Sequence, residues 1–285
     1  MLFLHGGPGS SCNADHRRYF DPGFFDIVLF DQRGCGRSTP LGEVADNDTW
    51  QLVEDIDAIR TSQGLGDRIC LFGGSWGSTL SLAYATRYPQ AIEEMILRGV
   101  FLGTGEEVRW FTDGLARFAP GAWQEFADGT VDDLVEYYYR EVNSPDRAIA
   151  SRAARRWASY EARTMRIGAS DTVQNRDIPL PAGDRLLARV RVQLHYLKNR
   201  CFLDDNQLLE SATDITMPVT IVQGGLDFIC PPITAFRLGK LLPRGTLRLV
   251  NDAGHDGMSG KLAAALTEEA NRLRDRLRNR HESAI

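Results

Sequence analysis

A short apolar run, a turn of small residues and a helix-like segment follow one another directly between residues 69 and 88. The turn contains the pattern Gly73-x-Ser75-x-Gly77. A tight strand-to-helix turn crowds its backbone, so that glycine is favoured on either side of the serine, and it strains the backbone of the serine itself. The pattern predicts a turn that presents Ser75 as a nucleophile at the end of a buried parallel strand.

Other short apolar runs alternate with helix-like segments along the chain. These runs are rich in Ile, Val, Leu or Phe, which is typical of strands buried on both faces of a sheet. The predicted strands are Leu2–Leu4, Ile27–Phe30, Ile69–Phe72, Met95–Leu97, Val219–Gln223 and Thr246–Val250. Apolar residues at helical spacing predict helices over Trp50–Ser62 and Gly77–Tyr88. The alternation predicts an α/β fold, with a mainly parallel sheet and helices on both of its faces.

This alternation stops between about residues 101 and 206. The stretch contains no convincing strand and is rich in Ala, Arg, Glu and aromatic residues. We interpret it as an inserted all-helical cap over the carboxyl ends of the strands, where sites form in open α/β sheets. The expected division is a core domain of residues 1–100 and 207–285 and a cap domain of residues 101–206. Most of the cap aromatics are expected to pack against one another.

Charge and composition exclude several classes of partner. The net charge of −5, from 33 Lys and Arg against 38 Asp and Glu, does not favour a nucleic acid. No apolar run approaches the roughly 20 residues that span a bilayer, and the start lacks the pattern of a signal peptide. The five cysteines form no CxxC pair and the five histidines no HxxxH pair, so no metal or other cofactor is expected. These features favour a cytoplasmic protein.

A reactive serine needs a base and an acid, and both follow it in the chain. Asp227 comes after the predicted strand Val219–Gln223, and His255 comes after the strand Thr246–Val250. The order Ser, Asp, His is that of the α/β-hydrolases, and the cap fills the long first gap. Taken alone, His255 is equally typical of a surface loop and Asp227 of a turn. Together they predict a catalytic triad in which His255 is the base and Asp227 orients it.

The loop after the first strand offers backbone donors for an oxyanion. The strand ends at His5-Gly6-Gly7-Pro8-Gly9, a run of small residues. The N–H of Trp76, which follows the nucleophile, and the N–H of Gly7 are the expected oxyanion-hole donors, with Gly6 as the second choice in the loop. A phosphate loop is not indicated, because neither GxGxxG nor GxxxxGK[ST] is present. We expect His5 to order this loop.

At this point the chain resembles one family, the proline iminopeptidases, which are capped α/β-hydrolases. The matching segments are His5–Gly9, Asp31–Ser38, Asn47–Trp50, Gly73–Leu80, Leu97–Gly99, Trp123, Cys230-Pro231 and Ala253–His255. The resemblance implies a serine aminopeptidase that releases an N-terminal residue, preferably proline, from peptides or small amides through an acyl-enzyme. An aspartate nucleophile is excluded because position 75 is serine.

The resemblance also implies a substrate pocket. Phe101 and Phe111 match positions that hold the pyrrolidine ring, with Trp110 beside them. Glu161 matches a carboxylate that holds the free amino end, and Tyr160 before it replaces a family tryptophan. An ammonium group taken out of water needs an opposite charge. The alternative for Glu161 is a solvated helix face.

Two departures from the family bear on function. Where the family carries a second Glu, two residues before its His-Tyr pair, this chain has the neutral Gln193. Recognition of a charged amine is thereby weakened, unless Asp204 or Asp205 substitutes, which predicts an altered substrate choice. The family also has two strands before the HGGPG loop. Their absence here would leave a sheet edge open, to be covered by residues encoded upstream or by a second subunit in a homo-oligomer.

Two other functions remain open on these residues. The first is an esterase, amidase or acyltransferase of a biosynthetic pathway on the same scaffold. The aromatic residues of the cap are compatible with this function as well as with an aminopeptidase. The second is a truncated, inactive binding protein. An N-blocked substrate separates an aminopeptidase from the first alternative, and a serine-directed probe separates an enzyme from the second.

Overall fold

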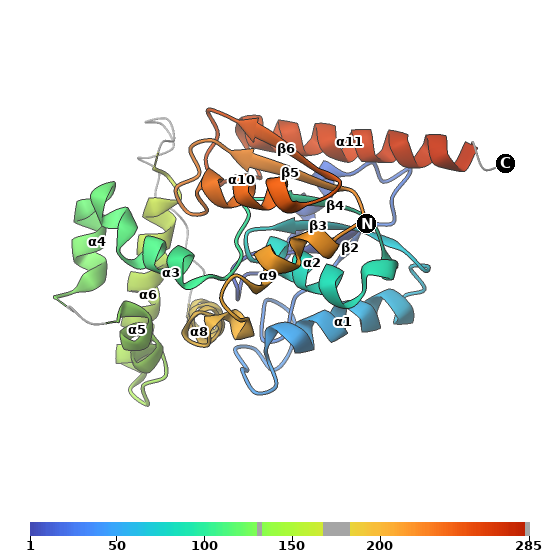
Figure 1. Ribbon diagram of the computed structural model, residues 1–285. Coiled ribbons are helices and arrows are strands. Elements are labelled where there is room, and N and C mark those ends of the chain that lie inside the picture. The colour runs from blue at the N-terminus through green and yellow to red at the C-terminus, as the bar shows by residue number, and fades with distance from the viewer. Residues whose placement is uncertain (130–132, 168–182, 283–285) are drawn as a thin grey trace.

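The computed structural model describes residues 1–129, 133–167 and 183–282. Its centre is a parallel sheet in the order β2-β1-β3-β4-β5-β6 (Figure 1). The strands are β1 (Leu2–Leu4), β2 (Val28–Leu29), β3 (Ile69–Gly74), β4 (Ile92–Arg98), β5 (Val219–Gly224) and β6 (Gly245–Val250). This arrangement confirms the predicted α/β class. The predicted strand at Ile27–Phe30 is shorter than expected, and it forms one edge of the sheet.

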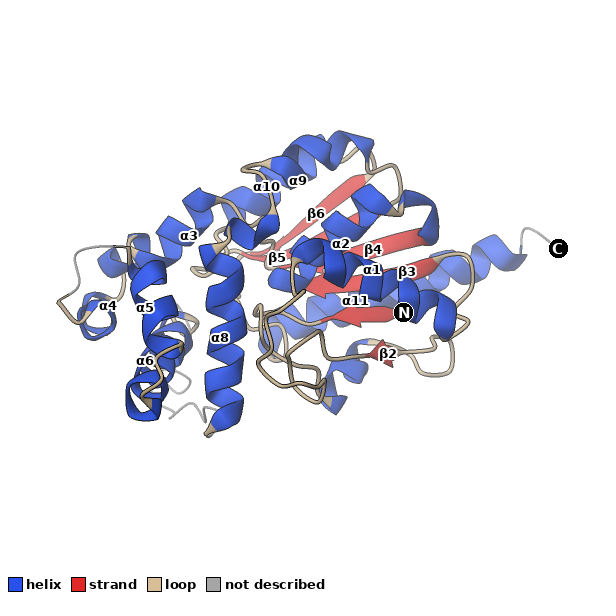
Figure 2. Cartoon of the chain, turned by 90° about the horizontal axis from the view of Figure 1, so that it is seen from below, coloured by secondary structure: helices blue, strands red, loops and turns tan. Residues whose placement is uncertain are grey.

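Side chains that alternate along each strand enter two separate cores. Leu71 of β3 faces the helices α1 (Thr49–Ser62), α2 (Trp76–Arg87) and α10 (Pro232–Leu241). Its neighbour Phe72 faces the opposite core, formed with α11 (Gly260–Glu282) and the 3-10 helix Ala14–Tyr19. Figure 2 shows α11 behind the sheet and α1, α2 and α10 in front of it. Because successive strand residues point to opposite faces, an uninterrupted apolar run is what a doubly covered sheet requires.

The described part of residues 101–206 is helical and has a core of its own. Its helices are α3 (Gly105–Thr112), α4 (Pro120–Ala127), α5 (Leu134–Val142), α6 (Arg147–Thr164) and α8 (Asp184–Lys198). Trp157 of α6 is fully buried at the centre of this core, among Phe126, Tyr138 and Tyr160. Most of the cap aromatics therefore pack against one another, because each amphipathic helix buries its apolar face against its neighbours.

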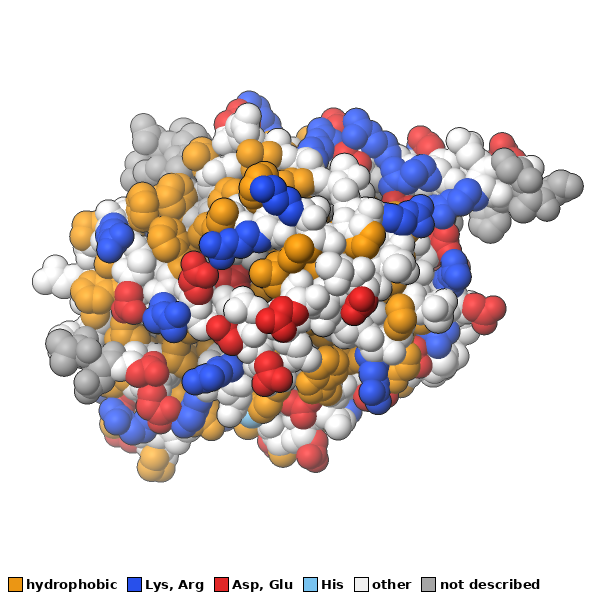
Figure 3. Space-filling view, in the orientation of Figure 1, with side chains coloured by type: hydrophobic (Ala, Val, Ile, Leu, Met, Phe, Trp, Pro, Cys, Tyr) orange, Lys and Arg blue, Asp and Glu red, His pale blue; other side chains and the backbone are white. Residues whose placement is uncertain are grey.

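Short elements complete the fold. The helix α9 (Gln207–Glu210) leads back to the sheet. Besides Ala14–Tyr19, 3-10 helices lie at Pro89–Ala91, Gly114–Arg117 and Ser211–Asp214, and Arg200–Phe202 forms a turn of three residues with positive φ. On the face shown in Figure 3, basic and acidic side chains are interspersed. Within the described ranges, no helix has both the length and the apolarity that a membrane span demands.

The cap lies directly on the loop that follows β1. Gly9 has a φ of +89°, and a Cβ placed on it would lie 2.3 Å from the carbonyl oxygen of Arg189 in α8. Two further glycines of the core approach the same helix less closely: a Cβ on Gly34 would lie 3.2 Å from Cγ2 of Val192, and one on Gly42 would lie 2.9 Å from Cβ of Ala188. Glycine is required at Gly9 because both its backbone conformation and the adjacent backbone exclude a side chain.

The glycines of the β3–α2 turn allow the same kind of close approach. A Cβ on Gly77 would lie 2.0 Å from the carbonyl oxygen of Leu4 in β1. A Cβ on Gly73 would lie 2.2 Å from the carbonyl oxygen of Gly77. Helix α2 can thus begin immediately beside the sheet, which fixes the position of Ser75 between these two glycines.

We expect Gly77→Ala to lower the free energy of unfolding by about 3 kcal/mol or more, because the added methyl group meets backbone that cannot move aside. Urea denaturation followed by circular dichroism measures the change. The matched control is Gly121→Ala in α4, where the added Cβ meets no atom within 4 Å. That control should change stability by less than about 1 kcal/mol, and toward greater stability. Equal effects of the two substitutions would contradict the proposed packing role of Gly77.

Candidate active site

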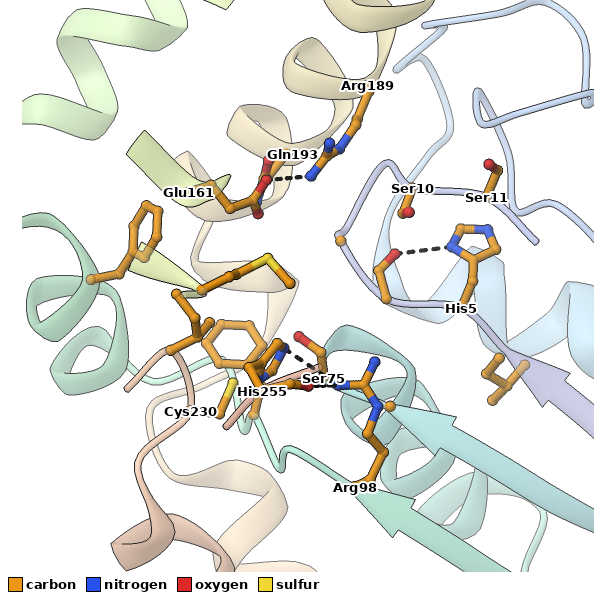
Figure 4. Close-up of a pocket in the computed structure, with 18 of the residues that line it drawn as sticks. His5, Ser10, Ser11, Ser75, Arg98, Glu161, Arg189, Gln193, Cys230 and His255 are labelled. Atoms are coloured by element: carbon orange, nitrogen blue, oxygen red, sulfur yellow. Dashed lines mark hydrogen bonds and ion pairs between the residues drawn. The ribbon is translucent and has the colours of Figure 1, made fainter. Parts of the chain in front are cut away.

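A cavity of about 200 Å³ lies between the sheet and the cap. Figure 4 shows Ser75, His255 and Arg98 on its core side, and Glu161, Gln193 and Arg189 on its cap side. The remaining lining residues with polar side chains are His5, Ser10, Ser11, His16, Glu107 and Cys230. The cavity is therefore apolar on part of its wall and carries polar groups at opposite ends, which is the usual form of a small-molecule site.

Ser75 occupies the turn between β3 and α2. Its backbone has φ 56° and ψ −123°, a conformation that residues other than glycine rarely adopt. The Ser75 N–H donates to the carbonyl oxygen of Arg98 on β4, at 2.9 Å. This bond and the glycine contacts hold the strained backbone in place, so that the hydroxyl is presented to the cavity at the first turn of a helix.

Asp227 and His255 are brought together from the ends of β5 and β6. The Nδ1 atom of His255 lies 2.8 Å from Oδ2 of Asp227, and both side chains are buried. The other carboxylate oxygen, Oδ1, accepts the N–H groups of Ile229 at 3.0 Å and Cys230 at 2.8 Å. A carboxylate held in this orientation accepts the imidazole N–H and so places the proton on Nδ1. The Nε2 atom then carries a lone pair and can act as a base.

Arg98 contacts the same histidine and was not predicted as a site residue. Its Nη1 donates to the carbonyl oxygen of His255 at 2.9 Å and lies 3.5 Å from Nε2. No hydrogen bond between Ser75 and His255 occurs in the described structure, although both line the cavity. A catalytic hydrogen bond of this kind often forms only with substrate bound. The sequence signal for Arg98 is a charged residue at the carboxyl end of a buried strand.

The predicted oxyanion-hole residues surround the serine. A Cβ on Gly6 would lie 3.4 Å from Cβ of Ser75, and Gly7 has a φ of +121°. Trp76 is the first residue of α2 and is buried. Neither its backbone N–H nor that of Gly7 has a hydrogen-bond acceptor within the described ranges. Both N–H groups therefore have no acceptor of their own, and their role as oxyanion-hole donors stays a prediction.

His5 orders the loop in the described structure. Its Nε2 accepts the backbone N–H of Gln32 at 3.0 Å, so that Nδ1 carries the proton and donates to the carbonyl oxygen of Gly6 at 2.9 Å. The side chain of Gln32 links the carbonyl oxygen of His5 to the indole N–H of Trp76, at 2.9 Å each. Burial lowers the pKa of His5 to about 4, so it is neutral near pH 7. The network connects the two halves of the candidate oxyanion hole.

The lowered pKa of His5 predicts a pH dependence of stability. An unfolded chain protonates this histidine below about pH 6.5, whereas the folded protein does so only near pH 4. Between these values the unfolded state binds more protons, so the native state loses up to about 3 kcal/mol as the pH falls. The measurement is the difference in unfolding free energy between wild type and His5→Gln from pH 7 to pH 4. We expect this difference to shrink, and a constant difference would contradict the assignment.

Four of the six predicted substrate-binding residues line the cavity: Phe101, Phe111, Glu161 and Gln193. The other two lie elsewhere. The Trp110 indole N–H donates to the carbonyl oxygen of Phe228 at 2.8 Å, and the Trp110 ring packs beside Phe118. Tyr160 stacks on Phe126 with ring centroids 4.0 Å apart, and its hydroxyl donates to the carbonyl oxygen of Phe111. The buried Tyr160 therefore serves cap packing, and the half-buried Trp110 joins the cap to the core segment that carries Phe228.

Comparison with known proteins identifies the family. The family model for the alpha/beta hydrolase fold matches residues 1–261. A Leptolyngbya boryana protein named "Probable proline iminopeptidase" is 41% identical over 280 residues, which cover 96% of this chain and 86% of the relative. The proline iminopeptidase of Arabidopsis thaliana is 40% identical over 93% of this chain and 72% of its own length. The chain belongs to the proline iminopeptidase family. It is therefore an enzyme of the α/β-hydrolase superfamily.

Solved structures agree at the level of the fold. The proline iminopeptidase of Mycobacterium smegmatis superposes with a TM-score of 0.64 at 18% identity, over 96% of this chain and 88% of that one. An esterase from a Rhodococcus species superposes almost as well, with a TM-score of 0.62 at 15% identity, over 96% of this chain and 89% of that one. At these identities the structures show a shared architecture, which does not by itself separate peptide from ester chemistry.

Within this proline iminopeptidase family member, the predicted carboxylate Glu161 is already engaged. Arg189 forms an ion pair with Glu161 Oε2, and the Nε2 amide of Gln193 donates to Oε1 at 2.9 Å. Arg189 was not predicted, although it precedes Gln193 by four residues and so shares its helix face. Asp204 and Asp205, the suggested substitutes for a second carboxylate, do not line the cavity, and Asp205 accepts the N–H of Gly105.

Two further cavity residues were not predicted as site residues. Burial raises the pKa of Glu107, whose carboxylate accepts the N–H groups of Leu102 and Thr104 and so braces the segment that carries Phe101. Burial also raises the pKa of Cys230, which keeps this thiol protonated beside the triad. Among the described residues, no group of His, Cys, Asp and Glu could hold a metal ion.

Proposed function

We propose that this protein is a serine hydrolase that releases an N-terminal residue, preferably proline, from short peptides or small amides. The observation that carries the proposal is the buried Asp227–His255 hydrogen bond at 2.8 Å, because it orients a histidine that lines the same cavity as Ser75. An oriented imidazole beside a serine with two free backbone donors is the apparatus of acyl transfer. The family relationship supports this reaction class.

The proposed reaction has two halves. His255 Nε2 takes the proton of Ser75 as Oγ attacks the substrate carbonyl, and the resulting oxyanion accepts the N–H groups of Gly7 and Trp76. The tetrahedral intermediate collapses, the bond to the leaving amine breaks, and His255 gives that amine its proton. Water then attacks the ester on Ser75 by the same route in reverse, which frees the carboxylic acid and restores the hydroxyl.

The cavity favours a small acyl group. Phe101 and Phe111 supply apolar wall, which suits the ring of proline. The polar groups of the cap lie at the end of the cavity opposite Ser75. The cavity volume of about 200 Å³ suits a single residue on the acyl side, which supports cleavage of terminal residues.

A set of matched chromogenic substrates tests the proposal. We expect prolyl p-nitroanilide to be hydrolysed and N-acetylprolyl p-nitroanilide to react at least about 100-fold more slowly in kcat/KM, because the acetyl group enlarges the acyl side and removes the free amine. Alanyl p-nitroanilide gauges the preference for the pyrrolidine ring. Comparable rates for the free and the acetylated substrate would contradict an aminopeptidase.

An esterase or amidase is the second candidate, and one observation favours it. Glu161 is paired with Arg189, so the cap side of the cavity has less negative charge to offer an ammonium group. Short p-nitrophenyl esters without an amino group, such as the butyrate, test this candidate. A kcat/KM for the butyrate ester above that for prolyl p-nitrophenyl ester would favour the esterase.

The partner proposed is a small peptide or amide, and the compartment proposed is the cytoplasm. All five cysteines are unpaired and buried, which suits a reducing environment. The small cavity supports a small-molecule partner.

A further inference from the structure

The cap side of the cavity is organised around the carboxylate of Glu161. Its side chain on α6 is 13% exposed, and that of its ion-pair partner Arg189 on α8 is 22% exposed. Figure 4 shows the two side chains meeting beside Gln193, facing the end of the cavity opposite Ser75. Both oxygens of Glu161 therefore have donors before any substrate arrives.

Gln193 is held so that it offers a donor to Glu161. The buried indole N–H of Trp157 donates to Oε1 of Gln193 at 3.0 Å. The amide oxygen is thus occupied, and the NH₂ group must turn toward Oε1 of Glu161. A substrate ammonium is also a donor, so the NH₂ group of Gln193 offers it no acceptor, and at Glu161 it meets two competing donors.

Arg189 has a buried donor that no described residue uses. Its Nε is buried and has no hydrogen-bond acceptor within the described ranges, and the residue lines the cavity. A guanidinium cannot be deprotonated in a protein, so burying an unused N–H is costly. A ligand oxygen that accepts a hydrogen bond from Arg189 would satisfy it.

From these contacts we propose that Arg189 is a specificity-determining residue that holds Glu161 in place of the substrate's ammonium group. This inference rests on the proposed hydrolase function. Among N-terminal residues, proline is then preferred for the shape of its ring, whereas a proline-sized acyl group with a neutral hydrogen-bond acceptor at the position of the ammonium is expected to react faster still. Ionised N-terminal proline still fits by shape, but it gains little from its charge, because the Glu161–Arg189 pair has no net charge.

Three p-nitroanilides of nearly equal shape test this assignment: prolyl, cyclopentanecarbonyl and tetrahydrofuran-2-carbonyl. They place an ammonium, a methylene and an ether oxygen at the same ring position. For the wild type we expect the tetrahydrofuran compound to have the highest kcat/KM and the prolyl compound to exceed the cyclopentane compound by less than about 3-fold.

Removing the guanidinium should restore recognition of the ammonium. In Arg189→Met, we expect the ratio of prolyl to tetrahydrofuran kcat/KM to rise at least about 10-fold, mainly through a lower KM for the prolyl compound. Gln193→Glu adds a carboxylate at the same end and should shift the ratio in the same direction. The control is Arg185→Met, one turn earlier on α8 and exposed, which should leave the ratio unchanged.

The outcomes separate this inference from the proposed function. An unchanged ratio in both Arg189→Met and Gln193→Glu, or a wild type that prefers the prolyl compound by about 100-fold or more, would overturn the role of Arg189. Labelling of Ser75 by a fluorophosphonate, tested on every variant, reports whether the active site is intact. If Arg189→Met does not fold, the ratio of prolyl to tetrahydrofuran kcat/KM in Gln193→Glu alone tests the role of Arg189. Failure of the wild type to label and to hydrolyse all three compounds would refute the hydrolase itself.

Discussion

Ser75→Ala is expected to lower kcat by about 10⁴-fold to 10⁶-fold on any substrate of the enzyme. Only the hydroxyl group is removed. The strained turn is held by backbone contacts, which are the hydrogen bond from the Ser75 N–H to the carbonyl oxygen of Arg98 and the close approach of Gly77 to Leu4. The variant should therefore fold normally. Steady-state kinetics with prolyl p-nitroanilide measure the loss, and thermal melting checks the fold.

The same variant tests whether Ser75 is the nucleophile. Wild type should form a covalent adduct with a fluorophosphonate, seen as a mass increase, and Ser75→Ala should form none. Ser62→Ala is the control, because Ser62 is exposed at the end of α1 and far in sequence from the triad. An adduct that persists in Ser75→Ala would place the nucleophile elsewhere.

Asp227→Asn is expected to lower kcat by about 10⁴-fold near pH 7. The carboxylate accepts from His255 on one oxygen and from the N–H groups of Ile229 and Cys230 on the other. An asparagine amide has an acceptor on one side only. If its oxygen stays with the backbone N–H groups, its NH₂ faces His255, moves the imidazole proton to Nε2 and removes the base.

The control for this substitution is Asp252→Asn. Asp252 lies three residues before His255 on the same loop, but it is exposed and pairs with Lys261. Its amide variant should keep kcat within about 2-fold, since an exposed ion pair contributes little. Similar losses in both variants would mean that loop charge, and not orientation of the imidazole, explains the effect of Asp227→Asn.

The core of the candidate site could be predicted because its residues sit at strand ends. Ser75, Asp227 and His255 each follow a short apolar run, and the carboxyl ends of parallel strands meet at one edge of a sheet. Knowing which segments are strands is therefore enough to predict that these three side chains lie close together, even though the cap separates Ser75 from the other two in the sequence. Strand lengths were less predictable, as the two-residue β2 shows, because pairing at an edge depends on neighbours outside the strand.

The cap side could not be predicted to the same depth. Phe111 and Tyr160 both lie on cap helices, yet one lines the cavity while the other stacks on Phe126. Helical spacing gives the apolar face of a helix but not which neighbour it meets. Arg189 and Glu161 lie 28 positions apart in the sequence, on two different helices. Whether they pair depends on how these helices cross.

The contact at Gly9 has a consequence for protein engineering. Here the backbone of the HGGPG loop and the backbone of α8 touch without an intervening side chain. The helical insert is consequently not an interchangeable module. A foreign insert grafted onto this scaffold would need a helix whose main chain passes equally near, or the loop would lose the support that it receives from α8.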